Sequence, residues 1–142
     1  MKFLQSYTVR GNIDPAEGPK YIQLFDGLFT TGFRVVRFVV SPQDIDNTGG
    51  NTYAAKLMTV DSGDRTEWDW SDNREIAWAA TSYDANGIVP EGIRVIDPDN
   101  MIIEDLYLYG KIPSALRMNY LIEFEKYDIS DGRGAMSMVR NQ

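Results

Sequence analysis

Cysteine and histidine are both absent from the 142 residues of this chain. Their absence excludes disulfide bonds, thiolate nucleophiles, Cys/His zinc sites and every acid or base step that uses an imidazole. The sequence also lacks a P-loop, a G-x-G-x-x-G turn and a serine nucleophile elbow. An active site would have to rest on carboxylates, lysine or tyrosine alone, so we expect a protein that is not an enzyme and holds no cofactor.

Basic side chains and long apolar runs are also scarce. The chain has 14 Lys and Arg residues against 21 Asp and Glu, which gives a formal charge of -7 and a pI near 4.5. Because such a surface repels phosphates and anionic lipids, we expect neither a nucleic-acid nor a membrane partner. No apolar run approaches the ~20 residues of a membrane span. Residues 1–10 contain no signal-peptide core, so we expect synthesis in the cytoplasm.

The sequence contains many short segments in which apolar residues recur at every second position. In the clearest run, five apolar side chains fall on one face of an extended chain: Leu116, Met118, Tyr120, Ile122 and Phe124. Glycine, proline, asparagine and aspartate bound the runs. This pattern predicts an all-β domain of about eight strands, at residues 3–10, 20–25, 28–40, 53–60, 74–83, 92–96, 101–110 and 115–127.

Eight antiparallel strands in a chain of this length favour a β-sandwich, and the jelly roll is the commonest eight-stranded version. We therefore predict a jelly-roll-like sandwich domain over residues 1–127. Strand number does not fix strand order, so another Greek-key sandwich or a flattened barrel stays open. Residues 128–142 follow as a C-terminal arm, which we expect to pack on a neighbouring subunit.

Local turn residues predict three hairpins and one bulge. Asp26-Gly27 tolerates the backbone angles of a tight hairpin turn, and residues 85–87 and 97–100 carry similar turn chemistry. Within residues 28–40 the apolar parity changes near Val36 and Arg37, which predicts a β-bulge at that point.

The segment 101–109 is apolar on both faces, although one sandwich core needs only one of them. An exposed second face would form a patch of the size that marks an interface. We therefore expect an intersubunit contact made by this face and the arm, with the residues Met101, Ile103, Tyr107, Tyr109, Met136 and Met138. The alternative is that a loop or the arm covers this face within one chain.

A polar loop holds two tryptophans beside two carboxylates: Trp68, Asp69, Trp70 and Asp72. The indoles would stack on sugar rings while the carboxylates bind hydroxyl groups, which gives a candidate glycan-binding site. Two other interpretations stay open: the indoles cap the open end of the core, or they anchor a second subunit.

The acidic side chains give no strong metal or catalytic signal. None reproduces the D-x-D-x-D-G loop of a calcium site, and Asx turns explain the closely spaced pairs, so we assign no metal ligand. Glu123 and Glu125 share a strand face with Arg117 and Asn119, which indicates a solvated face and no catalytic residue. The paired aspartates are Asp44 and Asp46, Asp61 and Asp64, and Asp97 and Asp99.

Three runs, at residues 31–35, 72–78 and 118–125, resemble small β-rich proteins encoded by environmental bacteriophages. The resemblance implies a viral structural protein located in the virion, such as a minor capsid, decoration or vertex subunit. Its partners would be other virion proteins and further copies of itself. The alternative is a carbohydrate-binding module that uses Trp68 and Trp70.

Overall fold

The predicted all-β class is confirmed. The computed structural model describes residues 2–15, 19–24, 27, 29–46, 48–61, 67–86 and 90–130, and these ranges contain eight β-strands and no helix. The strands are β1 (Lys2–Ile13), β2 (Lys20–Ile22), β3 (Thr31–Pro42), β4 (Thr52–Met58), β5 (Glu75–Tyr83), β6 (Pro90–Ile96), β7 (Leu106–Lys111) and β8 (Met118–Asp128).

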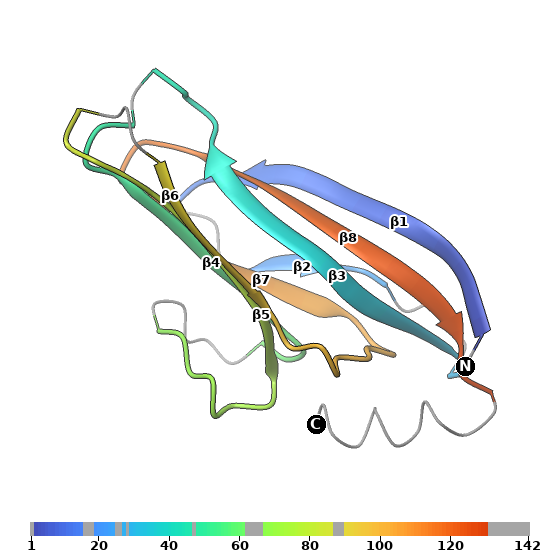
Figure 1. Ribbon diagram of the computed structural model, residues 1–142. Helices are drawn as coiled ribbons and strands as arrows, with labels where there is room; N and C mark the ends of the chain where they lie inside the picture. Colours follow the sequence, from blue (N-terminus) through green and yellow to red (C-terminus); the bar gives the residue numbers. More distant parts are fainter. Residues whose placement is uncertain are drawn as a thin grey trace.

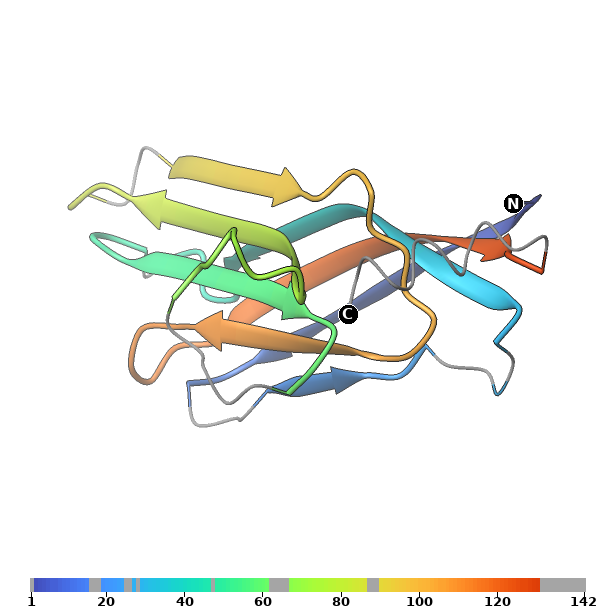
Figure 2. The ribbon, with the colours of Figure 1, turned by 90° about the horizontal axis from the view of Figure 1, so that it is seen from below.

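The strands form two antiparallel sheets that pack face to face as a β-sandwich (Figure 1). The three-stranded sheet has the order β1-β8-β3, and the five-stranded sheet has the order β2-β7-β4-β5-β6. At the end that carries the start of β1, the three-stranded sheet runs on past the five-stranded sheet (Figures 1 and 2). Among the described strands, none from the five-stranded sheet therefore covers this end of the three-stranded sheet.

The core lies between the sheets and follows the alternation of the strands. On β8, for example, Ile122 and Phe124 are fully buried while Glu123 and Glu125 between and beyond them face outward. The larger core side chains come from both sheets: Phe33, Phe38, Tyr53, Leu57, Ile76, Leu106, Leu108, Met118, Tyr120, Ile122 and Phe124. This alternation explains why the spacing of two located the strands.

The jelly-roll topology is not confirmed. The pairs β1–β8, β2–β7 and β4–β5 occur in a jelly roll, but that topology would also pair β3 with β6. Here β6 pairs with β5, and no ladder joins β3 to β6 among the described residues.

The chain between β6 and β7 covers part of the β3 edge instead. The backbones of Phe33 and Ile102 exchange two hydrogen bonds of 2.7 Å. Two residues along, the Asn100 side chain accepts from the Val35 amide at 2.8 Å and donates to the Val35 carbonyl at 3.1 Å. The side-chain amide of the buried Asn100 thus makes the two hydrogen bonds that the backbone of a neighbouring strand would make.

Two of the three predicted hairpins are wrong. The turn at residues 97–100 forms, with the Asn100 amide bonded to the Asp97 carbonyl, but it leads from one sheet to the edge of the other. The hairpin predicted at Asp26-Gly27 is also wrong because β2 and β3 lie in different sheets; Asp26 itself is outside the described residues. The β5–β6 hairpin is confirmed, and so is the bulge, at the register shift between Val35 and Arg37.

The predicted boundary between sandwich and arm stays a prediction. Strand β8 ends at Asp128 and the buried Ile129 follows it, whereas residues 131–142 are outside the described part of the chain. Met136 and Met138, predicted as contact residues, therefore lie outside it as well.

We expect Asn100→Ala to destabilise the protein by about 2–4 kcal/mol, because it leaves the buried amide and carbonyl of Val35 without their partners. Urea unfolding followed by tryptophan fluorescence measures the change. Asn73→Ala is the control, because Asn73 is exposed and in a turn. Equal stability of the two variants would contradict the bridging role of Asn100.

Candidate functional site

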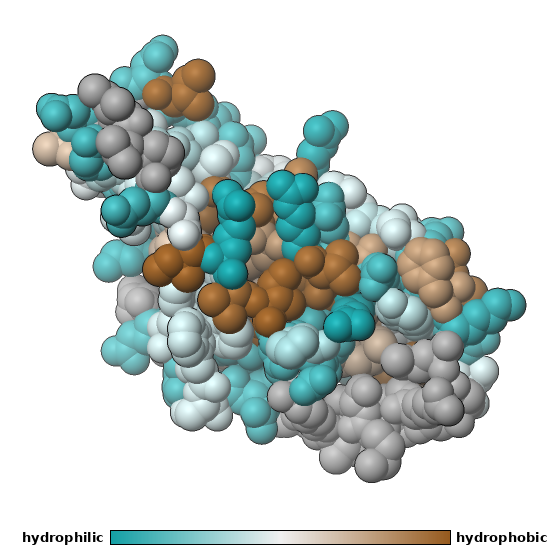
Figure 3. Space-filling view, in the orientation of Figure 1, coloured by the Kyte–Doolittle hydropathy of each residue, from teal (hydrophilic) through white to brown (hydrophobic). Residues whose placement is uncertain are grey.

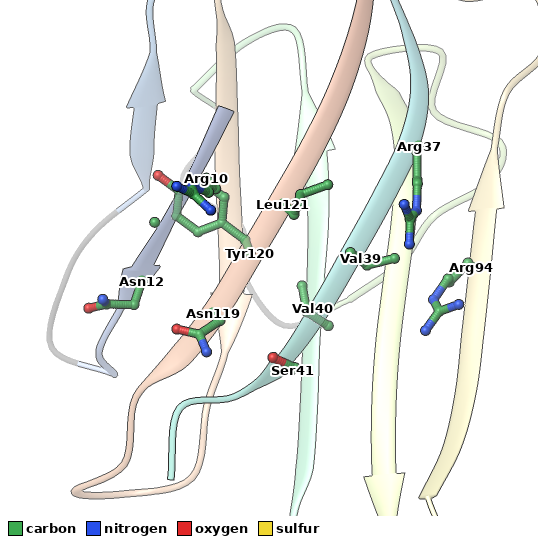
Figure 4. A pocket seen from close by; sticks show the side chains of 11 residues that line it. Arg10, Asn12, Arg37, Val39, Val40, Ser41, Arg94, Asn119, Tyr120 and Leu121 are labelled. Atoms are coloured by element: carbon green, nitrogen blue, oxygen red, sulfur yellow. The ribbon is translucent and has the colours of Figure 1, made fainter. Parts of the chain in front are cut away.

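A hollow of about 580 Å³ lies on the outer face of the three-stranded sheet (Figure 4). Most of its side chains come from strand positions that alternate with the core positions and point away from the core, whereas Val40 and Tyr120 also belong to the core. Arg94, from β6 of the other sheet, completes the rim beside β3. We call this feature the arginine hollow; it is lined by Arg10, Gly11, Asn12, Arg37, Val39, Val40, Ser41, Arg94, Asn119, Tyr120 and Leu121.

The arginine hollow is basic although the whole chain carries a charge of -7. Three arginines line it and no carboxylate does. Arg37 forms an ion pair of 3.5 Å with Glu123, both partners being partly exposed. The side chains of Arg10 and Arg94 form no hydrogen bond or ion pair within the described ranges, and both residues are exposed. Two guanidinium groups are thus available to an anionic group.

The floor of the hollow combines apolar and neutral polar groups. Val39 and Leu121 are half-buried, and Ser41, Asn12 and Asn119 supply hydroxyl and amide groups. In the space-filling view, hydrophobic and hydrophilic side chains alternate over the middle of β3 (Figure 3). The hollow therefore offers charge, hydrogen bonds and apolar contact together.

Part of the outer face of the five-stranded sheet is covered, in contrast, by residues 67–73 of the connection between β4 and β5. Beneath this connection Lys56 and Glu75 are both buried, with side chains only 2% and 3% exposed, and form an ion pair of 3.2 Å. Lys56 Nζ also donates to the Glu67 carbonyl at 2.7 Å. A buried lysine on β4 thus holds the backbone of the covering loop.

Glu75 fixes the same loop from the other side. Its Oε1 atom accepts from the Asp69 amide at 2.9 Å and from the Trp78 indole at 2.8 Å. Because every charge of the pair has several partners, burial does not leave an unsatisfied ion. Residues 67–73, which we call the Trp70 loop, are therefore held in place on the sheet.

The tryptophan loop predicted from the sequence lies here and not at the open end of the core. Trp70 is 63% exposed and its ring centroid is 5.7 Å from that of Trp78. Trp68 is half-buried. The interpretation in which both indoles cap the core is therefore wrong, whereas an exposed indole on a fixed support fits either a glycan or a second subunit.

The two carboxylates of that loop already have partners. Asp69 Oδ1 accepts from the amide and the hydroxyl of Ser71, at 3.0 and 2.5 Å. Both oxygens of Asp72 accept from Arg74, at 2.9 and 2.8 Å, and this lowers the pKa of the Asp72 carboxyl. Asp69 and Asp72 thus stabilise the turn.

The face predicted as an intersubunit contact is largely covered within one chain, so that prediction is wrong for three of its residues. Met101 and Ile103 are buried beside Ile129, because residues 101–105 cross to the edge of β3 before β7 begins. Tyr109 is buried under the loop and donates to Asp61 at 2.5 Å. Tyr107 is half-buried beside Tyr21.

The double apolar pattern of residues 101–109 therefore has a local cause. Its first half packs against β3, and its second half is a strand of the five-stranded sheet. The alternative left open by the sequence, that a loop covers this face, is the one observed for Tyr109.

The closely spaced acidic residues form turns and local contacts. Asp44 and Asp97 each accept from the backbone amide two residues ahead, at 3.0 Å, as expected for Asx turns. Asp64 is outside the described part of the chain. Within that part, no group of three or more acidic side chains is placed to hold a metal ion.

Hydrogen bonds to neighbouring carboxylates raise the pKa of two tyrosines. Tyr21 donates to Asp105, and this hydrogen bond raises the pKa of Tyr21 to about 12. Tyr127 donates to Glu125 at 2.7 Å, which raises the pKa of Tyr127. Glu125 is thus engaged on the outer face of the sheet, beside Glu123, which pairs with Arg37.

Sequence reasoning missed both the arginine hollow and the buried ion pair. The arginines come from β1, β3 and β6, which only strand order brings together. Lys56 and Glu75 occupy outward-facing positions of β4 and β5, and charged side chains are common at such positions. The one available signal was apolar residues around Lys56, in Tyr53-Ala54-Ala55-Lys56-Leu57-Met58.

Comparisons with known proteins add no relationship. No family model matches the chain, and neither a curated protein nor a solved structure matches it significantly. Among the described residues, no helix is long and apolar enough to cross a membrane.

We expect Lys56→Met to cost about 3–5 kcal/mol of unfolding free energy, because it leaves Glu75 as a buried carboxylate without its cation. Combining it with Glu75→Gln should cost less than the sum of the single changes, since the two residues are coupled. Urea unfolding measures both effects.

Arg74→Met is the matched control for this prediction. It breaks a neighbouring ion pair with Asp72 that is partly exposed, and such pairs contribute about 1 kcal/mol or less. If Lys56→Met were as mild as Arg74→Met, the buried pair would not hold the loop.

Proposed function

We propose that the protein is a non-enzymatic structural subunit that assembles with further copies and with other proteins. A bacteriophage virion is the setting that the sequence resemblance implies. The observation that carries the proposal is the open edge of the three-stranded sheet. Among the described residues, strand β1 pairs only with β8, whereas the opposite edge, β3, is partly covered by Asn100 and Ile102.

Strand β1 has the features of a strand that pairs with another chain. It is 12 residues long, and its residues from Lys2 to Thr8 are all exposed. An edge strand presents unpaired amides and carbonyls, which makes it a template for a further strand. Phe3 and Leu4 add apolar surface, being 51% and 46% exposed. This combination supports strand addition at β1.

The same strand also carries features that limit pairing to a specific contact. Its register shifts between Phe3 and Gln5, and its only charged side chains, Lys2 and Arg10, are basic. Bulges and charges on edge strands discourage open-ended aggregation. The arrangement therefore supports defined assembly rather than indiscriminate association.

Size-exclusion chromatography with light scattering tests this proposal, and we expect the mass to rise with protein concentration. Leu4→Glu should weaken the association by about tenfold or more, since it buries a charge in the contact. Ile45→Glu is the control, because Ile45 is 78% exposed and lies outside β1. A strictly monomeric protein, alone and with candidate virion proteins, would contradict the proposal.

A carbohydrate-binding module is the second candidate, and the exposed Trp70 indole favours it. Its support on Trp78 gives the fixed aromatic surface on which sugar rings stack. Asp69 and Asp72 count against it, because turn contacts already use Oδ1 of Asp69 and both oxygens of Asp72.

Glycan-array binding distinguishes the second candidate from the first. If sugars are the ligands, Trp70→Ala should abolish binding, whereas Ile93→Ala, which removes another exposed apolar side chain, should leave it unchanged. Binding that survives both Trp70→Ala and Trp68→Ala would remove this candidate.

A further inference from the structure

The arginine hollow and the Trp70 loop lie on opposite outer faces of the sandwich. The hollow is on the three-stranded sheet. The loop lies over the five-stranded sheet, where it contacts Lys56 and Trp78. One molecule therefore cannot place its own loop in its own hollow.

We infer that the arginine hollow of one molecule receives the Trp70 loop of a second copy. This inference rests on the proposed function, because it names the partner and the contact of an assembling subunit. The two surfaces carry opposite charge: the hollow is lined by Arg10, Arg37 and Arg94, and the loop carries the exposed Glu67 and Asp69.

Shape and polarity also match between the two surfaces. The exposed indole of Trp70 projects from the loop, and the hollow has Val39 and Leu121 in its lining. Guanidinium groups at the rim stack favourably on an indole face. Tryptophan and arginine are the residues that most often dominate the free energy of protein interfaces.

The loop is also held ready for docking. The Lys56 and Glu75 contacts fix the backbone at Glu67 and Asp69, and Trp78 supports Trp70. Because these contacts already order the loop, binding costs little additional conformational entropy.

The acidic groups nearest the hollow do not cancel its charge. Glu123 pairs with Arg37, and Glu125 accepts from Tyr127. Arg10 and Arg94 have no such partner among the described residues. These two arginines therefore make the strongest contribution to binding an acidic loop.

Such a contact is head-to-tail, since the two interacting surfaces differ. An open assembly has a free hollow at one end and a free loop at the other, so contacts repeat until a ring closes or a filament grows. The inference thus predicts directional assembly.

Light scattering on the unaltered full chain and three variants tests the contact. Trp70→Ala should weaken association by roughly 30-fold or more, as for an interface hot spot. The double variant Arg10→Glu/Arg94→Glu should weaken it similarly, and added salt should weaken the unaltered protein. The control, Lys20→Glu/Lys111→Glu, makes the same change in net charge at exposed lysines elsewhere and should have little effect.

A mixing experiment sharpens the test. The Arg10→Glu/Arg94→Glu variant keeps its loop, and the Trp70→Ala variant keeps its hollow. When both variants also carry Leu4→Glu, which weakens the β1 contact, each should be monomeric alone, and together they should form a one-to-one complex that grows no further. Circular dichroism of each variant checks that it is folded, and the salt dependence of the unaltered protein supplies a measurement without substitutions.

The outcomes separate this inference from the proposed function. If the unaltered protein associates but the loop and hollow variants behave like the lysine control, or no mixed complex forms, the inference is wrong and assembly through β1 stands. If Leu4→Glu also leaves association unchanged, the proposed assembly through β1 is wrong as well. A monomer under all conditions contradicts both.

Discussion

The buried ion pair between Lys56 and Glu75 determines what the outer face of the five-stranded sheet presents. Its oxygens and its ammonium group bind the backbone at Glu67 and Asp69, so residues 67–73 are held against the sheet. Tyr109 and Trp78 are thereby removed from solvent, and Trp70 is left exposed. A face that would otherwise be a broad apolar patch becomes a polar loop with one indole on it.

The two edges of the three-stranded sheet differ: the β3 edge is partly covered by the chain itself, and the β1 edge is open. This difference decides which edge can pair with a partner. Asn100 and Ile102 occupy part of the β3 edge, at Phe33 and Val35, which the chain reaches by leaving the five-stranded sheet after β6. Within the part of the chain that the structure describes, strand β1 receives no such cover. Because strand pairing requires a free edge, the edge at β1 is the one open to a partner along most of its length.

Alternation and turn residues were enough to predict the all-β class, the strands and the bulge before Arg37. They failed at residues 97–105, where a turn resembling a hairpin turn carries the chain to the other sheet. Local patterns describe neighbours in sequence, whereas the arginine hollow depends on β1, β3, β6 and β8 meeting in space. For the same reason the sequence did not predict the buried ion pair of Lys56: its partner Glu75 is 19 positions away, on the neighbouring strand.

Because Lys56 is buried, chemical labelling of its amine reports on the motion of the loop that covers it. Acylating reagents modify exposed lysines at once, but they reach this one only when the covering loop lifts from the sheet. Local openings of this kind require less free energy than global unfolding. The rate at which Lys56 becomes labelled therefore follows the motion of a single loop, and it separates that motion from unfolding of the whole sandwich.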